Sequence, residues 1–221
     1  MSTKIAILSY QDQLQGLKQQ LAEMLPKDKL AIFNQDARQL AADFSQPLKL
    51  HAGDKAPLFV LPNATGKNLE LKSLLQQGAV VLTFYRGVWC PYCNLQLKTY
   101  QSILPQIKLA GASLVAISPM KPDATTQMQS SNELQFEVLS DIGNKVASEF
   151  TSINPNPQTS IQAMTDLGYD FHSFYADRSA GLPVPATFVI ARNGTILFAS
   201  SAGGDYRERV EPQAILGALG A

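Results

Sequence analysis

The stretch VVLTFYRGVWCPYC, residues 80 to 93, decides the fold class and contains the only two cysteines of the chain. Its first half is a run of β-branched and aromatic residues, which is typical of a central strand covered on both faces. A helix is predicted to follow from about Cys90 to Ala110, with a kink at Pro105. Cys90 therefore lies where a buried strand ends and a helix begins.

The CxxC motif formed by Cys90 and Cys93 is predicted to be a redox centre. Backbone N–H groups without helical partners and the helix dipole stabilise an anion at the amino end of a helix. We therefore expect Cys90 to be an exposed thiolate with a pKa below that of free cysteine. Cys93 lies one turn further along the same helix face, so its sulfur is expected to come close enough to form a disulfide with Cys90.

A zinc site and a structurally inert pair are the two alternatives for these cysteines. Zinc is usually bound by four ligands, and one CxxC motif supplies two. The two histidines, His51 and His172, have no ligand-like spacing, so no metal site is predicted. Inert cysteines are usually buried in apolar surroundings and not placed at helix starts. The position of the pair therefore favours redox chemistry.

Predicted strands and helices alternate from about residue 48 to the end of the chain. A second buried strand is predicted over residues 113 to 118, after the first helix. Asn193-Gly194 lies between two β-rich runs, which is the strongest short-range signal for a β-hairpin. This order predicts an α/β domain over residues 48–221, built as a three-layer sandwich with a mixed central sheet.

An N-terminal segment and an insertion lie outside this pattern. Residues 1–47 predict a helical hairpin, because apolar residues recur at helical spacing on both sides of Pro26. The apolar faces of its helices are expected to pack against each other, against the main domain or against a second subunit in a homodimer. Residues 151–182 are less regular and are interpreted as an insertion that covers the active site.

Composition and charge exclude several function classes. The 221 residues are 45% hydrophobic, and 18 basic residues balance 18 acidic residues, so no net field attracts nucleic acid or an anionic membrane. No apolar run approaches the length that spans a bilayer, and the N-terminus lacks the pattern of a signal peptide. Two cysteines cannot form the several disulfides that stabilise small secreted domains. The predicted location is therefore the reducing cytoplasm.

Trp89 and Pro185 are further candidates for the site. Trp89, directly before Cys90, is interpreted either as core or as a flat surface that shields the sulfur or docks a partner. Pro185 opens the next-to-last predicted strand. It is interpreted either as an edge proline or as a cis proline beside the cysteines, with the preceding backbone free to pair with an extended substrate.

Several segments together resemble the thioredoxin superfamily. WCPYC resembles the thioredoxin active site, and PVPATFVIARNGTI resembles its cis-proline strand and hairpin. Between roughly Leu48 and Leu219 the chain is similar to the peroxiredoxin-like branch of the alkyl hydroperoxide reductase and thiol-specific antioxidant family, in the segments GDKAPLFVLPNATGKNLELKSLL, VVLTFYRGVWCPYCNLQL, LVAISPMKPD, FEVLSDIGNKVASEF and DYRERVEP. The resemblance implies a thioredoxin-like fold and thiol-dependent peroxidase activity. It implies no cofactor beyond an external thiol reductant such as thioredoxin or glutathione.

The chain departs from this family at three positions. Counted from Tyr85, the attacking cysteine of the family falls on Cys93, and the family's threonine falls on Cys90. The family's proline is Arg86 here, and its peroxide-binding arginine falls on Pro185. Two groups that activate the peroxide in the family are therefore replaced.

Two parts of the sequence are candidates to supply the missing positive charge. Arg86 lies four residues before Cys90, although a strand-end arginine is usually solvated. If Pro185 lies beside the cysteines, the hairpin that follows it returns the loop GGDYRER to the same edge of the sheet. Arg207 or Arg209 in that loop is then the second candidate, although a solvated charged loop is the safer interpretation.

The leading hypothesis is a peroxidase that reduces hydrogen peroxide or organic hydroperoxides through a Cys90/Cys93 dithiol–disulfide cycle. Trp89, Arg86 and Pro185 are its predicted substrate-binding residues. Helix position favours Cys90 as the attacking sulfur, whereas the resemblance favours Cys93. The alternatives are a thioredoxin-like oxidoreductase that acts on protein or small-molecule disulfides, and a redox sensor without turnover.

Overall fold

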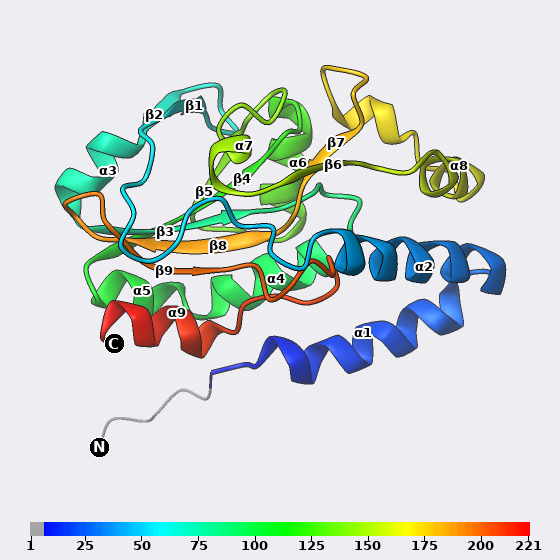
Figure 1. The fold of residues 1–221 in the computed structure, drawn as a ribbon, viewed down its shortest axis with the longest axis horizontal. Coiled ribbons are helices and arrows are strands. Elements are labelled where there is room, and N and C mark those ends of the chain that lie inside the picture. Colours follow the sequence, from blue (N-terminus) through cyan, green and yellow to red (C-terminus); the bar gives the residue numbers. More distant parts are fainter. Residues whose placement is uncertain (1–6) are drawn as a thin grey trace.

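The computed structural model describes residues 7–221 and has a central five-stranded sheet with the order β5-β4-β3-β8-β9 (Figure 1). Its strands are β3 (Ala79–Phe84), β4 (Ala112–Ser118), β5 (Glu137–Ser140), β8 (Ala186–Ile190) and β9 (Ile196–Ser200). β3, β4 and β5 run parallel, whereas β8 is antiparallel to both β3 and β9. The predicted mixed sheet and the β-hairpin at Asn193-Gly194 are confirmed.

Helices cover both faces of this sheet, as a three-layer sandwich requires. Side chains of β3 alternate between two core clusters, with Val80 and Leu82 in one and Val81 in the other. The face of Val81 packs against α4 (Pro91–Ser102), α5 (Leu104–Leu109) and α9 (Pro212–Leu219). The opposite face packs against α3 (Leu71–Gln77) and α7 (Ala147–Phe150).

Smaller elements complete the domain. They are the antiparallel pairs β1 (Val60–Pro62) with β2 (Asn68–Glu70) and β6 (Ile153–Pro155) with β7 (Gly181–Pro183), the helices α6 (Pro122–Ser131) and α8 (Gln158–Asp166), and the 3-10 helix η1 (Phe171–Phe174). The predicted insertion thus contains β6, α8 and η1. In residues 7–221 the structure has no helix long and apolar enough to cross a membrane.

The long helix predicted after Cys90 is divided into α4 and α5. The break lies at Ile103, whose φ and ψ of −100° and 3° leave the helical region, and Pro105 occupies the first turn of α5. Proline has no N–H group to donate and its ring crowds the preceding turn, so the chain starts a new helix here.

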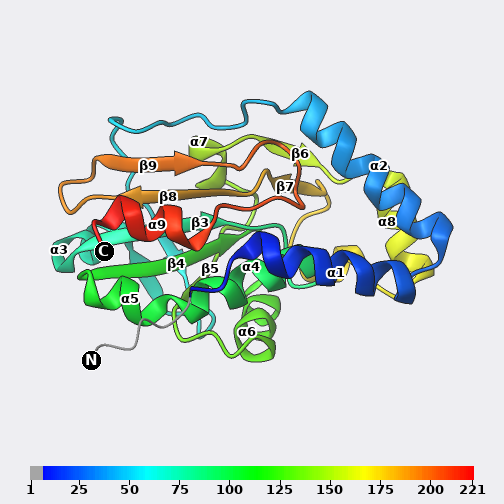
Figure 2. The same ribbon diagram turned by 90° about the horizontal axis from the view of Figure 1, so that it is seen from below.

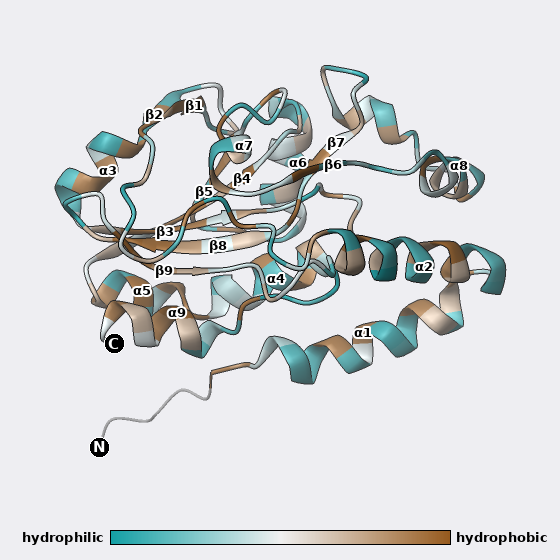
Figure 3. Cartoon of the chain, viewed as in Figure 1, coloured by the Kyte–Doolittle hydropathy of each residue, from teal (hydrophilic) through white to brown (hydrophobic). Residues whose placement is uncertain are grey.

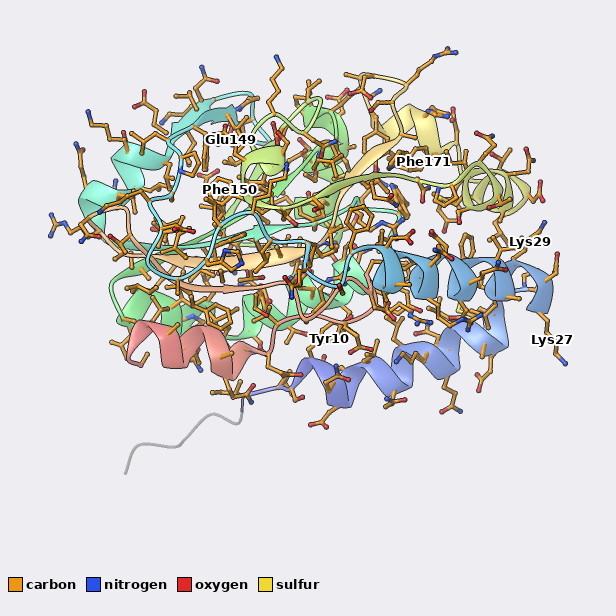
Figure 4. The ribbon with its side chains drawn as sticks, viewed as in Figure 1. Tyr10, Lys27, Lys29, Glu149, Phe150 and Phe171 are labelled. Carbon is orange, nitrogen blue, oxygen red and sulfur yellow. The ribbon has the colours of Figure 1, made fainter. Side chains whose placement is uncertain are left out.

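The N-terminal segment forms the predicted hairpin of two helices, α1 (Tyr10–Met24) and α2 (Lys27–Asp43). Figure 3 shows hydrophilic and hydrophobic residues mixed along both helices, as expected of amphipathic helices. Figure 2 shows α1 beside α4, and the two helices are in contact. Tyr10, labelled in Figure 4, and Leu14 are fully buried in the main core cluster. The hairpin therefore packs on the domain of its own chain, and its role in a homodimer stays a prediction.

Gly204 marks a close approach between the hairpin and the loop after β9. A Cβ atom at this position would lie 2.8 Å from the carbonyl oxygen of Leu40 and closer still to that of Phe44. We expect Gly204→Ala to separate the loop from α2 and to lower the free energy of unfolding by about 1 to 3 kcal/mol. Thermal unfolding measures the change. Gly217→Ala, in α9 with open space around it, is the control and should be neutral or stabilising. Equal midpoints for Gly204→Ala and wild type would contradict the close approach.

Candidate active site

Cys90 is the N-cap of helix α4. Its carbonyl oxygen accepts hydrogen bonds from the backbone N–H groups of Cys93 at 3.0 Å and Asn94 at 3.1 Å. Pro91 occupies the first turn of the helix, where the N–H that proline lacks has no helical acceptor. The predicted strand–helix junction is confirmed, and one helical turn separates the two cysteines.

Both cysteine side chains are buried, which corrects the prediction of an exposed thiol. Cys90 is 1% exposed and Cys93 is 0% exposed. The α1–α2 hairpin and α8 cover the junction and line a cavity in front of Cys90. The cover comes from segments that are distant in the sequence, so a helix-start position alone does not reveal it.

The cavity has a volume of about 530 Å³ and brings together residues from the hairpin, the junction and the insertion. Cys90 is part of its lining, whereas Cys93 is not. Its apolar lining includes Leu17, Leu21, Met24, Leu30, Phe33 and Met164. Its polar lining includes Asp36, Arg86, Asn156 and Ser160. Cys90 is therefore the cysteine of the pair that lies next to the cavity.

Arg209 supplies the positive charge beside the buried sulfur of Cys93. Its Nη2 atom donates to Cys93 Sγ at 3.4 Å. Its Nε atom donates to Gln96 Oε1 at 2.8 Å, and Nη1 donates to the carbonyl oxygens of Glu208, at 2.7 Å, and Tyr206. These acceptors fix the orientation of the guanidinium group, which is itself almost fully buried.

Arg207, the other candidate in this loop, lies outside the site. Its guanidinium group pairs with Asp205, with Nη2 2.6 Å from Oδ2, and donates from Nη1 to Asn34 Oδ1 at 2.8 Å. The hairpin geometry inferred from the sequence correctly returns the loop GGDYRER to the cysteines. It is Arg209, two residues later, that makes the contact.

The pKa values of the two cysteine thiols move in opposite directions. For Cys90, burial is the largest cause and acts together with the hydrogen bond to Cys93 and the charge on Cys93 to raise the pKa well above that of free cysteine. For Cys93, burial acts in the same direction, but the hydrogen bond from Cys90 and the charge of Arg209 outweigh it and hold the pKa well below the usual value. The contact with Arg209 and the direction of both pKa shifts favour a thiolate on Cys93, whereas the sequence analysis assigned it to Cys90.

Arg86 is buried and not solvated, which corrects the more cautious sequence interpretation. Its Nη2 atom donates to Asn156 Oδ1 at 2.9 Å and lies 3.9 Å from Asp36 Oδ2. Its guanidinium carbon lies 3.9 Å from the ring centre of Tyr206 and 5.1 Å from that of Trp89. A cation held over aromatic rings adds positive charge to the cavity beside Cys90.

Trp89 forms part of the cavity wall and also packs against the main core cluster, so its role in shielding the sulfur stays a prediction. Its Nε1 atom donates to the Tyr175 hydroxyl at 2.8 Å, and that hydroxyl donates to the Arg86 carbonyl oxygen at 2.9 Å. Its ring packs edge-on against Phe171, with the ring centres 5.6 Å apart. The indole is thus fixed in position between the junction and η1.

The cis-proline interpretation of Pro185 is wrong. The described residues contain no cis peptide bond. The backbone of Val184, expected to be free for an extended substrate, donates from its N–H to the Ser152 carbonyl oxygen at 2.9 Å. Its carbonyl oxygen accepts from Thr151 Oγ1 at 3.0 Å. The insertion thus occupies the hydrogen-bonding groups that a polypeptide substrate would need, and Pro185 does not line the cavity.

Comparison with known proteins identifies the family. The model of the AhpC/TSA family matches residues 52–199. The chain belongs to the AhpC/TSA family. A relative from Mycobacterium tuberculosis, which is provisionally named a peroxiredoxin, is 28% identical over 151 residues. These residues are 68% of this chain and 85% of the relative. The thiol-disulfide oxidoreductase ResA of Bacillus anthracis is 30% identical over 115 residues, 52% of this chain and 65% of ResA.

The solved structures agree with an AhpC/TSA fold. The crystal structure of peroxidoxin BcpB from Mycobacterium tuberculosis superposes with a TM-score of 0.60 at 22% identity, covering 77% of this chain and 96% of BcpB. The thioredoxin-like fold implied by the resemblance is confirmed. As an AhpC/TSA protein with a paired CxxC, the chain is an oxidoreductase that acts through thiols.

Asp36 and Gln96 are among the residues of this AhpC/TSA site that the sequence analysis missed. Asp36 lies three residues after Phe33 and four before Leu40 in α2, so a carboxylate interrupts the apolar face of that helix, and this signal was available. Its pKa is raised because of burial, an effect that the charge of Arg86 opposes. Gln96 looks like an ordinary helix residue in sequence, and no local pattern predicts its contact with Arg209.

Proposed function

We propose that this protein is a thiol-dependent peroxidase that reduces hydrogen peroxide and organic hydroperoxides through a Cys90–Cys93 disulfide. One observation carries the proposal. Cys90 lies at the wall of a cavity of about 530 Å³, one helical turn from Cys93, whose sulfur accepts a hydrogen bond from Arg209 at 3.4 Å. A small molecule can reach this pair through the cavity. A cytoplasmic location, where the pair starts each cycle reduced, is part of the proposal.

The oxidation step divides the work between the two cysteines. The sulfur of Cys90 attacks one peroxide oxygen while its proton moves to the Cys93 thiolate, so Cys93 acts as a base. The O–O bond breaks, Cys90 becomes a sulfenic acid, and the departing alkoxide takes the proton from Cys93 and leaves as an alcohol. Hydrogen peroxide yields water by the same step.

The disulfide forms in the second step. Cys93, again a thiolate, attacks the sulfur of the Cys90 sulfenic acid, and the S–O bond breaks. The hydroxide that leaves takes a proton from solvent and becomes water. The peroxide has then received two electrons, and the two thiols have been oxidised to one disulfide. Arg209, which no step consumes, keeps Cys93 ionised for both roles.

Burial of the pair favours a peroxidase over an oxidoreductase that acts on protein disulfides. A protein disulfide reaches an attacking sulfur only if that sulfur is accessible at the surface, and Cys90 is almost fully buried. The backbone of Val184 already bonds to the insertion. The cavity falls within the 300 to 1,000 Å³ that is roughly typical of small-molecule sites.

Two rates measured on the reduced protein test this function. We expect micromolar hydrogen peroxide and cumene hydroperoxide to oxidise the pair within seconds, as followed by the fluorescence of Trp89, the only tryptophan. We expect insulin reduction by the same protein to remain near the rate without protein. Rapid insulin reduction together with slow peroxide oxidation would instead support the disulfide oxidoreductase.

A further inference from the structure

The oxidised protein offers one sulfur to a reductant. Cys90 lines the cavity, whereas Cys93 is fully buried behind it and does not line the cavity. Thiol–disulfide exchange requires a thiolate to approach one sulfur of the disulfide while the other sulfur leaves. The position of the cavity therefore makes Cys90 the sulfur that is attacked and Cys93 the sulfur that leaves.

The charges at the site favour the same direction of attack. Exchange is faster when the leaving sulfur has a low pKa. Cys93 has a pKa well below that of free cysteine, because the hydrogen bond from Cys90 and the charge of Arg209 outweigh burial. Arg209 Nη2 lies 3.4 Å from Cys93 Sγ, where its positive charge stabilises the thiolate that leaves. Attack at Cys90 is thus favoured by access and by the leaving group.

The cover over the cavity decides which thiols can approach. The walls come from three separate segments, α1, α2 and α8, and include Leu17, Leu21 and Met164. The hairpin is fastened to the loop of Arg209, since the Tyr206 hydroxyl donates to the Phe33 carbonyl oxygen at 2.7 Å and the Tyr10 hydroxyl donates to that of Arg207 at 2.7 Å. A folded protein carries its reactive sulfur on a broad surface, and Cys90 is only 1% exposed to such a surface.

The lining of the cavity is suited to a small thiol that carries oxygen acceptors. Arg86 and Asn156 are polar residues of the wall, and each is at least nine-tenths buried. The Nδ2 group of Asn156 has no hydrogen-bond partner among residues 7–221. An amide or carboxylate oxygen of a bound thiol compound could accept a hydrogen bond from this Nδ2 group.

We propose, on the basis of the proposed function, that the physiological reductant is a low-molecular-weight thiol that enters the cavity and forms a mixed disulfide with Cys90. The first thiolate attacks the Cys90 sulfur, the Cys90–Cys93 bond breaks, and Cys93 leaves as a thiolate. A second thiolate attacks the sulfur of the bound thiol. The mixed disulfide breaks, Cys90 takes a proton from solvent, and two thiols leave as one disulfide. The protein disulfide gains the two electrons that the two thiols lose.

The reductive step is tested apart from the peroxidase reaction. The full chain is oxidised with diamide, which needs no peroxide, and mixed with glutathione, with a polymer-linked thiol too large for the cavity, or with reduced thioredoxin. Samples are quenched with acid, alkylated and weighed by mass spectrometry. We expect glutathione to open the disulfide at least roughly 100-fold faster, per thiolate, than the polymer-linked thiol, and faster than thioredoxin. Faster reduction by thioredoxin, or equal rates for the small and the large thiol, would overturn the proposal.

A cavity-filling variant locates the route of the thiol. Leu21→Trp narrows the cavity and should slow reduction by glutathione at least about 10-fold. Leu109→Trp places the same side chain on a position that is 89% exposed in α5 and outside the cavity, and should leave the rate unchanged. An unchanged rate in a folded Leu21→Trp protein contradicts entry through the cavity.

Single-cysteine variants give a second readout that does not depend on the stability of Leu21→Trp. Treated with oxidised glutathione, Cys93→Ser should form a mixed disulfide at Cys90, whereas Cys90→Ser should form little at Cys93. A mixed disulfide at Cys93 would refute the assigned point of attack. If peroxide fails to oxidise the protein but glutathione reduces the diamide-made disulfide as expected, the proposed function fails and the assignment of the reductant stands.

Discussion

Cys90→Ser should lose peroxide consumption, by on the order of 1,000-fold or more, because it removes the sulfur that lines the cavity. Cys93→Ser should still reduce one equivalent of peroxide, more slowly, since Cys90 keeps its access but loses the thiolate that accepts its proton. Without Cys93 no disulfide can form, and the sulfenic acid should persist on Cys90. Dimedone, which labels sulfenic acids, followed by peptide mass spectrometry, identifies the modified residue.

The same experiment can reverse the assignment of the attacking cysteine. A dimedone adduct on Cys93 in the Cys90→Ser protein would show that the peroxide reaches the buried thiolate directly. The roles of the two sulfurs would then follow the family alignment, which places the attacking cysteine at Cys93. Serine has nearly the size of cysteine, so both variants should keep the wild-type circular dichroism spectrum, and this serves as the folding control.

Arg209→Met should slow the reaction of the reduced protein with peroxide by about 10- to 100-fold near neutral pH. The substitution keeps the aliphatic length but removes the positive charge 3.4 Å from Cys93 Sγ. The pKa of Cys93 is lowered in the wild type by the hydrogen bond from Cys90 and by Arg209, against the effect of burial. Without Arg209 the thiolate forms only at higher pH.

The pH profile separates this electrostatic effect from a general loss of structure. The wild-type rate should stay high as the pH falls to neutrality and decline only below the lowered pKa of Cys93. In Arg209→Met the decline should begin at higher pH, and sufficiently alkaline buffer should restore part of the rate. Stopped-flow measurement over a range of pH checks both statements. Identical profiles would rule out this role for Arg209.

Arg207→Met is the matched control for this prediction. Arg207 lies in the same loop and is also paired, but its partners are Asp205 and Asn34 and not the cysteines. We expect its pH profile to match the wild type. Arg209→Lys should fall between the two, because lysine keeps the charge but not the planar group that contacts Gln96 and Cys93 together.

Much of the fold could be predicted because its signals are local. The run before Cys90 is apolar almost without interruption and forms the central strand β3. Asn193-Gly194 fixes a hairpin because glycine adopts the positive φ, 83° here, that such a turn requires. Apolar spacing around Pro26 gives both helices of the N-terminal hairpin.

The site was less predictable because its properties depend on contacts between distant segments. The helix start correctly located the anion-stabilising position, yet Arg209 lies more than a hundred residues later and shifts the thiolate to Cys93. The cavity beside Cys90 is lined by α1, α2 and α8, none of which is adjacent to Cys90 in sequence. At Pro185 the sequence motif suggested a site for an extended substrate. In the structure, the hydrogen-bonding groups of the preceding residue, Val184, are already bonded to Thr151 and Ser152 of the insertion.

Some of the charged groups at this site lie on either side of the shared family segment. The AhpC/TSA match covers residues 52–199, whereas Asp36 precedes it and Tyr206 and Arg209 follow it. The shared segment thus contributes both cysteines, Arg86 and α8, and the two flanks add Arg209 and the α1–α2 hairpin. Relatives that share this segment but differ in the flanking residues would share the thiol chemistry and differ in the substrates and reductants that they accept.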